Sequence, residues 1–180
     1  MKPCPAPEVE ITDVKVDSGI IYGWDVVDDG QNALLMLDIQ PNGITQAELE
    51  EILKLGMEND TDNTAKLTVS NYVSYKERNL IPNGATVTLE VENIQGTKTT
   101  KTYAIVILGD ANCNGRTDSG DATMMMNHFY GTNKLSGLAL VAADNNQNGK
   151  IEAGDARKNQ VKFLEGSTAD AIRYVSALTK

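Results

Sequence analysis

The sequence is poor in the residue types on which many catalytic and metal sites depend. Its two cysteines, Cys4 and Cys113, are too few for a disulfide framework and lack the spacing of a metal site. His128 is the single histidine, which excludes a His-rich zinc site, and we expect it to be a solvated helix residue. The adjacent carboxylates Asp28–Asp29 and Glu50–Glu51 are typical of a turn and a solvated helix face rather than of a glycosidase pair. We therefore do not expect an enzyme.

Long apolar runs and an excess of positive charge are also missing. No stretch of 18 or more apolar residues is present, and the first seven residues lack the apolar core of a secretory signal. The formal net charge is −9, and the acidic excess lies within residues 1–108. Such a chain has no electrostatic attraction for a phosphate backbone or an anionic bilayer. We expect neither nucleic acid nor membrane as a partner.

The apolar residues that are present suffice for a core. The chain has 180 residues, of which 41% are hydrophobic and only 5% aromatic. This length predicts one domain or two small ones, so a large enzyme built on a single core is not expected.

Residues 8–108 are dominated by short segments in which apolar and polar residues alternate. Val, Ile, Thr and Tyr recur in these segments, and Asp-Gly, Asn-Gly and Gln-Gly turns separate them. We predict antiparallel strands within residues 9–16, 34–39, 66–72, 86–91 and 99–108. Strands of this kind favour a β-sandwich.

One segment of this first half has the pattern of a helix. Thr45 and Glu48 form a capping box, and Gly56 follows as a stop signal. Between them lies an apolar stripe formed by Leu49, Ile52, Leu53 and Leu55. The pattern predicts a helix of about three turns that covers one edge or end of the sandwich.

The composition changes after Leu108, where Asp, Asn and Gly recur between helical segments. We place a domain boundary here, which gives domains 1–108 and 109–180. No linker rich in Pro, Ser or Thr separates them, so we expect a short, stiff junction and two halves that pack together.

The second half contains one 12-residue segment written twice, at 110–121 and 144–155, 34 residues apart. Six of the twelve positions are identical, and both copies place oxygen-bearing side chains at positions 1, 3, 5, 9 and 12 and a glycine at position 6. This is the ligand spacing of an EF-hand calcium loop, in which about six to eight oxygens surround a hard cation. The predicted ligands are Asp110, Asn112, Asn114, the Arg116 carbonyl, Asp118 (directly or through water) and Asp121, and then Asp144, Asn146, Asn148, the Lys150 carbonyl, Glu152 and Asp155.

A plainer interpretation is that the two segments are polar turns that cap helices, since Asp and Asn are common in such turns. The same pattern found twice at every ligand position argues against chance, because each residue type makes up only roughly a twentieth of a typical protein. We therefore favour the calcium loops.

Two departures from the general EF-hand pattern suggest a particular family. Position 12 is Asp121 and Asp155 rather than Glu, and the segment before the first loop has the pattern of a strand rather than an entering helix. With the short repeat, residues 109–166 resemble the dockerins of bacterial cellulosomes, in which each loop is followed by an exiting helix. The preceding β segment is similar, in context and strand pattern, to the Ig-like X module of X–dockerin pairs.

The resemblance implies a two-domain fold with an N-terminal all-β, Ig-like sandwich containing one short helix. The C-terminal domain is then an all-α, dockerin-like pair of calcium-loop and helix motifs that bind two Ca²⁺.

By the same resemblance, the two exiting helices carry the surface that binds a cohesin domain. If position 10 begins each helix, one face holds the expected core residues Ala122, Met125 and Phe129, and their counterparts Ala156 and Phe163. The adjacent face gives the predicted cohesin contacts Ser119, Gly120, Met126, Asn127 and Tyr130, and then Ala153, Gly154, Gln160, Val161 and Leu164. The two faces differ after position 11, so we expect one binding orientation to dominate. Neither copies the commonest dockerin pattern, so the cohesin type is left open.

A second capping box follows Gly166. Ser167 and Asp170 form it, and apolar residues recur at helical spacing up to Leu178. We predict a separate helix here that packs on the second domain.

The resemblance implies a secreted, non-catalytic assembly module, located extracellularly in a cellulosome or cell-surface complex of an anaerobic bacterium. Its partner would be the cohesin of a scaffoldin or a cell-surface anchoring protein, and we expect a monomer when it is free. Two alternatives remain. A calcium-stabilised carbohydrate-binding module would use Tyr22, Trp24, Tyr72 or Tyr75. An intracellular calcium sensor would need entering helices and a methionine-rich groove, and the lack of such helices argues against it.

Overall fold

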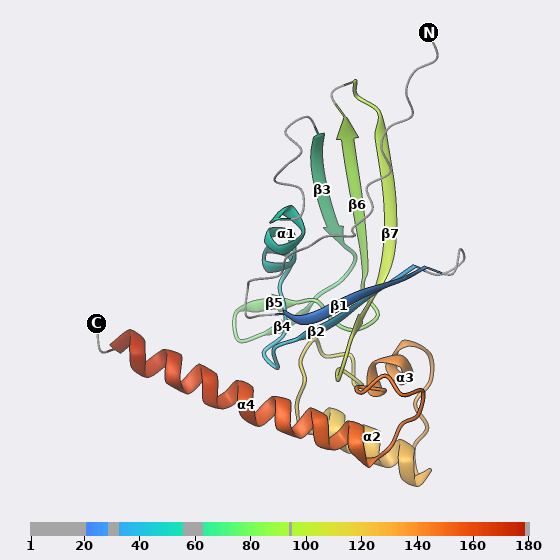
Figure 1. Cartoon of the computed structure of the whole chain (residues 1–180), viewed down its shortest axis with the longest axis vertical. Coiled ribbons are helices and arrows are strands. Elements are labelled where there is room, and N and C mark those ends of the chain that lie inside the picture. Colours follow the sequence, from blue (N-terminus) through green and yellow to red (C-terminus); the bar gives the residue numbers. More distant parts are fainter. Residues whose placement is uncertain (1–20, 29–32, 56–62, 94, 179–180) are drawn as a thin grey trace.

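The computed structural model describes residues 21–28, 33–55, 63–93 and 95–178 (Figure 1). We call residues 21–107 the β half and residues 108–178 the helical half. The elements of the β half are β1 (Ile21–Asp28), β2 (Ala33–Ile39), α1 (Gln46–Leu55), β3 (Asn63–Val69), β4 (Val73–Tyr75), β5 (Arg78–Leu80), β6 (Thr86–Asn93) and β7 (Lys98–Ile107). Those of the helical half are α2 (Ser119–Tyr130), α3 (Gly137–Ala143) and α4 (Ala153–Leu178).

The long strands of the β half form one five-stranded sheet in the order β1-β2-β7-β6-β3. Neighbouring strands are antiparallel except for β2 and β7, which pair in parallel with Leu34 opposite Ala104 and Leu37 opposite Ile107. The expectation of purely antiparallel strands was therefore wrong at this pair. It failed because alternation reports which residues face the core and does not report the direction of the neighbouring strand.

The strands predicted within 34–39, 86–91 and 99–108 correspond to β2, β6 and β7, and the one within 66–72 overlaps β3, which ends at Val69. The predicted strand at 9–16 lies outside the described residues. We did not predict β1 or the short β4–β5 hairpin, which forms a separate two-stranded sheet. The described residues do not confirm an Ig-like sandwich, which stays a prediction.

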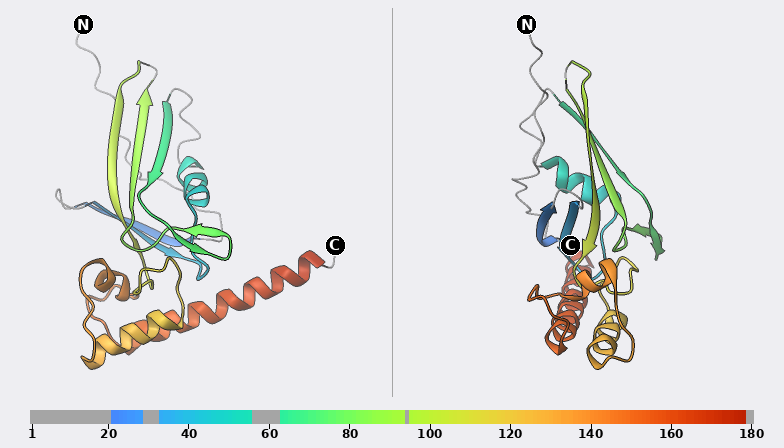
Figure 2. Two further views of the ribbon diagram at one scale, coloured as in Figure 1. Left: turned by 180° about the vertical axis from the view of Figure 1, so that it is seen from behind. Right: turned by 90° about the vertical axis from the view of Figure 1, so that its right-hand side faces the viewer.

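The predicted helix near residue 45 is confirmed as α1. Its capping box forms as expected, because Thr45 N–H donates to Glu48 Oε2 at 2.7 Å and Glu48 N–H donates to Thr45 Oγ1 at 3.3 Å. Figure 2 shows α1 against the sheet, next to β3. Its Leu49 enters the main core, together with inward-facing residues of β2, β6 and β7 such as Leu37 and Ile105.

The helical half packs against one end of the sheet. Leu108 extends β7 by donating its N–H to Leu37 O at 2.9 Å, and the chain then enters the first predicted loop. α3 lies against this end, where Ala142 is buried with Met36 and Val106 of the sheet. α2 and α4 lie side by side, and α4 continues well beyond α2 (Figure 1). None of the described helices combines the length and the apolar character that a membrane-spanning segment needs.

Two predictions for the helical half were wrong. The second capping box does not begin a new helix, because α4 is continuous from Ala153 to Leu178. Ala122, Met125 and Ala156 lie in the core as predicted, but Phe129 is 48% and Phe163 37% exposed. Leu135, from the segment between α2 and α3, is buried in this small core instead.

Candidate metal centre

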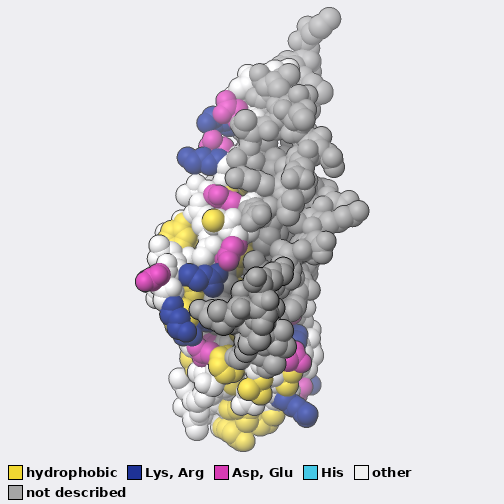
Figure 3. Space-filling view, turned by 90° about the vertical axis from the view of Figure 1, so that its left-hand side faces the viewer, with side chains coloured by type: hydrophobic (Ala, Val, Ile, Leu, Met, Phe, Trp, Pro, Cys, Tyr) yellow, Lys and Arg dark blue, Asp and Glu magenta, His cyan; other side chains and the backbone are white. Residues whose placement is uncertain are grey.

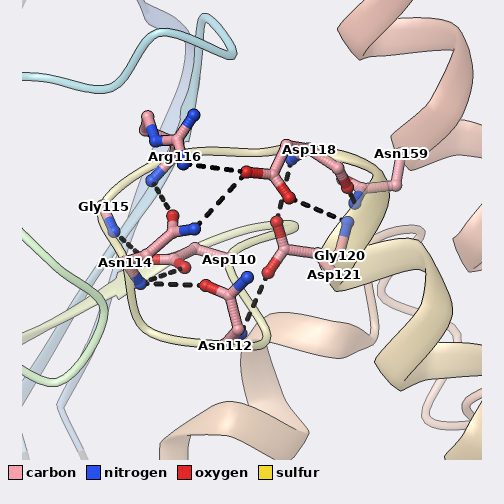
Figure 4. Close-up of polar contacts among 9 residues, drawn as sticks. All are labelled: Asp110, Asn112, Asn114, Gly115, Arg116, Asp118, Gly120, Asp121 and Asn159. Atoms are coloured by element: carbon pink, nitrogen blue, oxygen red, sulfur yellow. Dashed lines mark hydrogen bonds and ion pairs between the residues drawn. The ribbon is translucent and has the colours of Figure 1, made fainter. Parts of the chain in front are cut away.

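Both predicted loops fold in the same way, and the carboxylate at position 1 organises each of them. Figure 4 shows the first loop. In the first loop, Asp110 accepts the N–H of Asn114 through Oδ1 and the N–H of Gly115 through Oδ2, both at 2.9 Å. In the second loop, Asp144 accepts the N–H groups of the same two positions at 3.0 and 2.7 Å. In both loops, the amide oxygen at position 3 accepts the N–H of position 5, and the amide oxygen at position 5 accepts the N–H of position 7. The sequence repeat is therefore also a repeat in hydrogen bonding.

The carboxylate at position 12 closes each loop. Asp121 accepts the N–H groups of Asn112 at 2.9 Å and Asp118 at 2.8 Å. Asp155 accepts the N–H groups of the corresponding positions 3 and 9 at 3.0 and 2.9 Å. Because a carboxylate has about four lone-pair sites, each of these side chains can brace its loop and still bind a cation.

Two positions in each loop adopt a left-handed backbone conformation. Position 6 has φ of 77° at Gly115 and 82° at Gly149, as the predicted sharp turn requires. Position 4 has φ of 59° at Cys113 and 58° at Gln147, which the sequence did not signal because neither residue type favours this region. The tight wrapping turns the side chains of alternate residues toward the inside of the loop (Figure 4).

The exiting helix begins at position 10 of each loop, as predicted. α2 begins at Ser119 and α4 at Ala153. Asp118 is the N-cap of α2 and accepts the N–H of Gly120 at 2.8 Å, while Asp121 completes the capping box. Two predicted ligands thus also set the start of the helix, so an ion bound in the loop would hold the helix in place.

The first loop concentrates negative charge away from solvent. Asp110 and Asp121 are fully buried. The pKa of Asp121 is raised to about 7. Burial is the main cause and the charges of Asp110 and Asp118 add to it, against the N–H donors of Asp118 and Asn112. Burial also raises the pKa of Asp110, against three backbone N–H donors. Carboxylates held this close fit a divalent cation, which would remove their mutual repulsion.

The donors gathered in each loop are oxygens of two kinds. Within the described ranges, no three His, Cys, Asp or Glu side chains form a group that could hold a metal ion by themselves. Asn side chains at positions 3 and 5 supply amide oxygens next to the carboxylates in both loops. Calcium accepts carboxylate, amide and carbonyl oxygens together, whereas zinc sites rely on His and Cys. The residues present therefore fit calcium.

The predicted partner contacts lie on α2 and α4 but are not equally accessible. All five on α4 are exposed, whereas on α2 Met126 and Asn127 are partly buried. Met126 packs against the core, and the Asn127 carbonyl accepts the N–H of Thr132 in the turn after α2. The exposed large apolar residues of the two helices are Phe129 (48%), Tyr130 (69%), Val161 (43%), Phe163 (37%) and Leu164 (63%). Figure 3 shows hydrophobic side chains gathered at this end of the molecule.

Among the remaining predictions, Cys113 is exposed, and Cys4 lies outside the described residues. His128 is not simply solvated. It is half-buried, and its Nδ1 accepts the N–H of Leu135 at 2.9 Å, which ties the end of α2 to the following turn. The prediction that His128 is solvated was wrong, because helical spacing does not show that the turn after α2 folds back onto this side chain.

Sequence reasoning missed the residues that join the two halves. Asn83 of the β half donates its N–H to Asp110 at 3.0 Å, and Asp38 of β2 pairs with Lys162 of α4. Both lie far from their partners in the sequence. The one available signal was that Asn83 precedes a glycine, and that pattern predicts only a turn.

Comparison with known proteins places the two loops in a family. Residues 108–158 match the family model of the dockerin type I domain. No curated protein and no solved structure matches the chain. The family match stops short of the β half, so the X module stays a prediction. The duplicated loops, α2 and the first six residues of α4 fall within the matched segment, and residues 108–158 therefore form a dockerin type I domain.

Proposed function

We propose that this chain is a non-catalytic assembly module of a secreted, extracellular complex of the cellulosome type. Its helical half would bind a cohesin domain of a scaffoldin or cell-surface anchoring protein through the exposed faces of α2 and α4. One observation carries the proposal: two loops with the same hydrogen-bond network each lead directly into a helix with exposed apolar side chains.

Dockerin type I domains bind calcium, and we propose one ion in each loop of this chain. The ligands would be the side chains at positions 1, 3, 5, 9 and 12 and the carbonyl at position 7, as predicted from the sequence. Calcium supplies positive charge at the centre of each loop, where the carboxylates repel one another. Because Asp118 and Asp121 also cap α2, calcium binding contributes to folding, and its removal should weaken the surface that α2 and α4 present.

The two helices would not contribute equally to the partner surface. Val161 and Leu164 of α4 are accessible, whereas their counterpart region on α2 is partly used by the core and by the turn after Tyr130. Apolar side chains that are exposed in the free protein and buried in a complex are the usual anchors of an interface. We propose that the cohesin docks mainly on α4, with Tyr130 of α2 as a flanking contact.

We also propose that a domain boundary lies between residues 108 and 109 and that the β half is an X-like module. The support is the way the halves are joined: Thr117 N–H donates to Pro41 O at 3.1 Å, and Asn83 N–H donates to Asp110 Oδ2 at 3.0 Å. A β half fixed in this way would brace the dockerin without contacting the cohesin face itself.

Isothermal titration calorimetry of the full chain with type I cohesin domains tests the proposal. We expect binding in calcium and loss of binding after chelation with EDTA. Binding that is equally tight after full chelation would contradict the mechanism, and no binding to any cohesin would contradict the partner.

No observation on the described residues favours the carbohydrate-binding alternative. Tyr72 is 43% exposed but its hydroxyl contacts the Gln46 side chain, and the ring of Tyr75 is covered by the Arg116 guanidinium at 3.9 Å. The side chains of Tyr22 and Trp24 lie outside the described part of the chain. A pull-down on insoluble polysaccharide separates this alternative from cohesin binding.

A further inference from the structure

The two loops share their internal bonds but differ in their surroundings. Gly115 of the first loop is buried, whereas Gly149 at the same position of the second is exposed. The Asp110 carboxylate accepts two N–H groups from its own loop and a third from Asn83, which reaches Oδ2 at 3.0 Å. Within the described residues, the hydrogen bonds of the Asp144 carboxylate come from its own loop alone. The extra donor belongs to the β half.

Asn83 is held firmly in position by its own side chain. The residue is 4% exposed, its Oδ1 accepts the N–H of Ile107 at 3.3 Å, and its Nδ2 donates to Leu138 O at 3.2 Å. Ile107 ends β7 and Leu138 lies in α3. The side chain therefore fixes the backbone N–H of Asn83 relative to the end of β7, which leads into the first loop, and relative to α3.

The backbone of the β half also leaves the first loop little freedom. A Cβ atom added at Gly43 would lie 2.1 Å from Gly115 O, and one added at Gly115 would lie 3.0 Å from Ile81 O. Nothing lies within 4 Å of a Cβ atom added at Gly149. The first loop is thus held in its wrapped conformation by a surface that the second loop lacks.

We propose that Asn83 is a positioning residue for the first calcium loop, which therefore binds calcium more tightly than the second and couples its ion to the β half. The inference rests on the calcium binding proposed above. A loop that is already held loses less conformational freedom when it binds an ion. Groups that orient a metal ligand typically change metal affinity by about 10- to 100-fold. The second loop is exposed at residues 146–150, and within the described residues its first carboxylate accepts hydrogen bonds from its own loop alone, so it should fill independently.

Residue-resolved NMR of the full chain at a series of buffered free calcium concentrations tests this inference. The N–H groups of Gly115 and Gly149 each donate to the first carboxylate of their own loop, so their signals report the two loops separately. We expect the Gly115 and Asn83 signals to move together, at a free calcium concentration about tenfold lower than the Gly149 signal.

The Asn83→Ala variant removes the side-chain bonds of this residue to Ile107 and Leu138, and also the contact of its Nδ2 with Cys113 Sγ in the first loop at 3.6 Å. We expect it to raise the calcium midpoint of Gly115 about tenfold and leave that of Gly149 unchanged. Val87→Ala, in the buried core of the β half away from the loop, is the control for general destabilisation and should keep the two midpoints apart.

Coincident midpoints of Gly115 and Gly149 in the unmodified chain would overturn the inference even if Asn83→Ala fails to fold. An equal shift of both midpoints in Asn83→Ala, or equal effects of Asn83→Ala and Val87→Ala, would also overturn it. If both glycine signals respond to calcium but at the same free concentration, calcium binding is supported, and only the proposed difference between the two loops is refuted. If neither responds to calcium, the proposed calcium binding fails as well.

Discussion

Lys162 Nζ lies 2.5 Å from Asp38 Oδ1, which joins the middle of α4 to β2 across the two halves. Lys162 is 8% exposed and also donates to Leu108 O at 3.2 Å, at the end of the sheet. Burial lowers the pKa of Lys162, and the charge of Asp38 opposes this change. The helix that carries most of the exposed partner face is thus attached to the β half by a largely buried ion pair.

Replacing Asp38 with Ala should destabilise the protein, because it leaves the buried ammonium of Lys162 without its carboxylate. Loss of one partner of a buried pair costs about 3 kcal/mol or more. Chemical denaturation measures this as a fall in the free energy of unfolding. Lys162→Met, which removes the buried charge itself, should have the smaller effect. Glu90→Ala, which breaks the exposed pair with Lys98, is the matched control and should change little. An unchanged stability of Asp38→Ala would show that the pair does not hold the halves together.

Removing calcium should lower the stability of the helical half. A ligand that binds only the folded state adds about 2.7 kcal/mol when its concentration is about 100 times its Kd. Thermal unfolding in calcium and in EDTA measures this difference. Asp121→Ala and Asp155→Ala should each lose part of it, because each removes a predicted ligand. A calcium-dependent rise in Tm that survives in both variants would contradict the ligand assignment.

Charge introduced on the exposed face of α4 should prevent cohesin binding without unfolding the protein. Val161 is 43% and Leu164 63% exposed, so Val161→Asp and Leu164→Asp change no core contact. If these side chains are anchors, each change should weaken binding by about 2 kcal/mol or more, roughly 30-fold in Kd. Leu140→Asp on α3 is a control with a similarly exposed apolar residue outside the predicted face. Equal effects of all three variants in calorimetry would refute the location of the face.

Acid should weaken the β half through Glu48. Burial alone would raise the pKa of Glu48, but hydrogen bonds from Thr45 and the charge and hydrogen bond of Arg78 lower it overall. A lowered folded-state pKa means that Glu48 stabilises the fold above the unfolded-state value of about 4.3. This contribution disappears as the pH falls through the folded-state pKa.

The comparison with Glu48→Gln isolates this effect. The difference in free energy of unfolding between the two proteins should be largest near pH 7 and should shrink toward pH 3. Urea denaturation at several pH values measures it. A difference that does not vary with pH would mean that the Glu48 charge plays no part.

Features encoded by local spacing were predictable. The calcium-loop pattern at 110–121 and 144–155 predicted two loops, and both form with the same hydrogen bonds. The prediction was possible because the donor positions and the glycine at position 6 depend only on residues within each loop. Thr45 and Glu48 predicted the start of α1 for the same reason. The positive φ of Cys113 and Gln147 was not predictable, because neither residue type prefers it.

Local sequence patterns were thus enough to predict the oxygen donors of the loops, the helices that leave them and most of the strands. The tertiary structure alone decided that β2 pairs in parallel with β7, that Phe129 and Phe163 are exposed, and that α4 runs through the second capping box. It also brought Asn83 to Asp110 and Asp38 to Lys162. The reason is physical: periodicity and capping act over a few residues, whereas strand direction, core filling and pairing between distant side chains depend on which surfaces meet when the two halves pack.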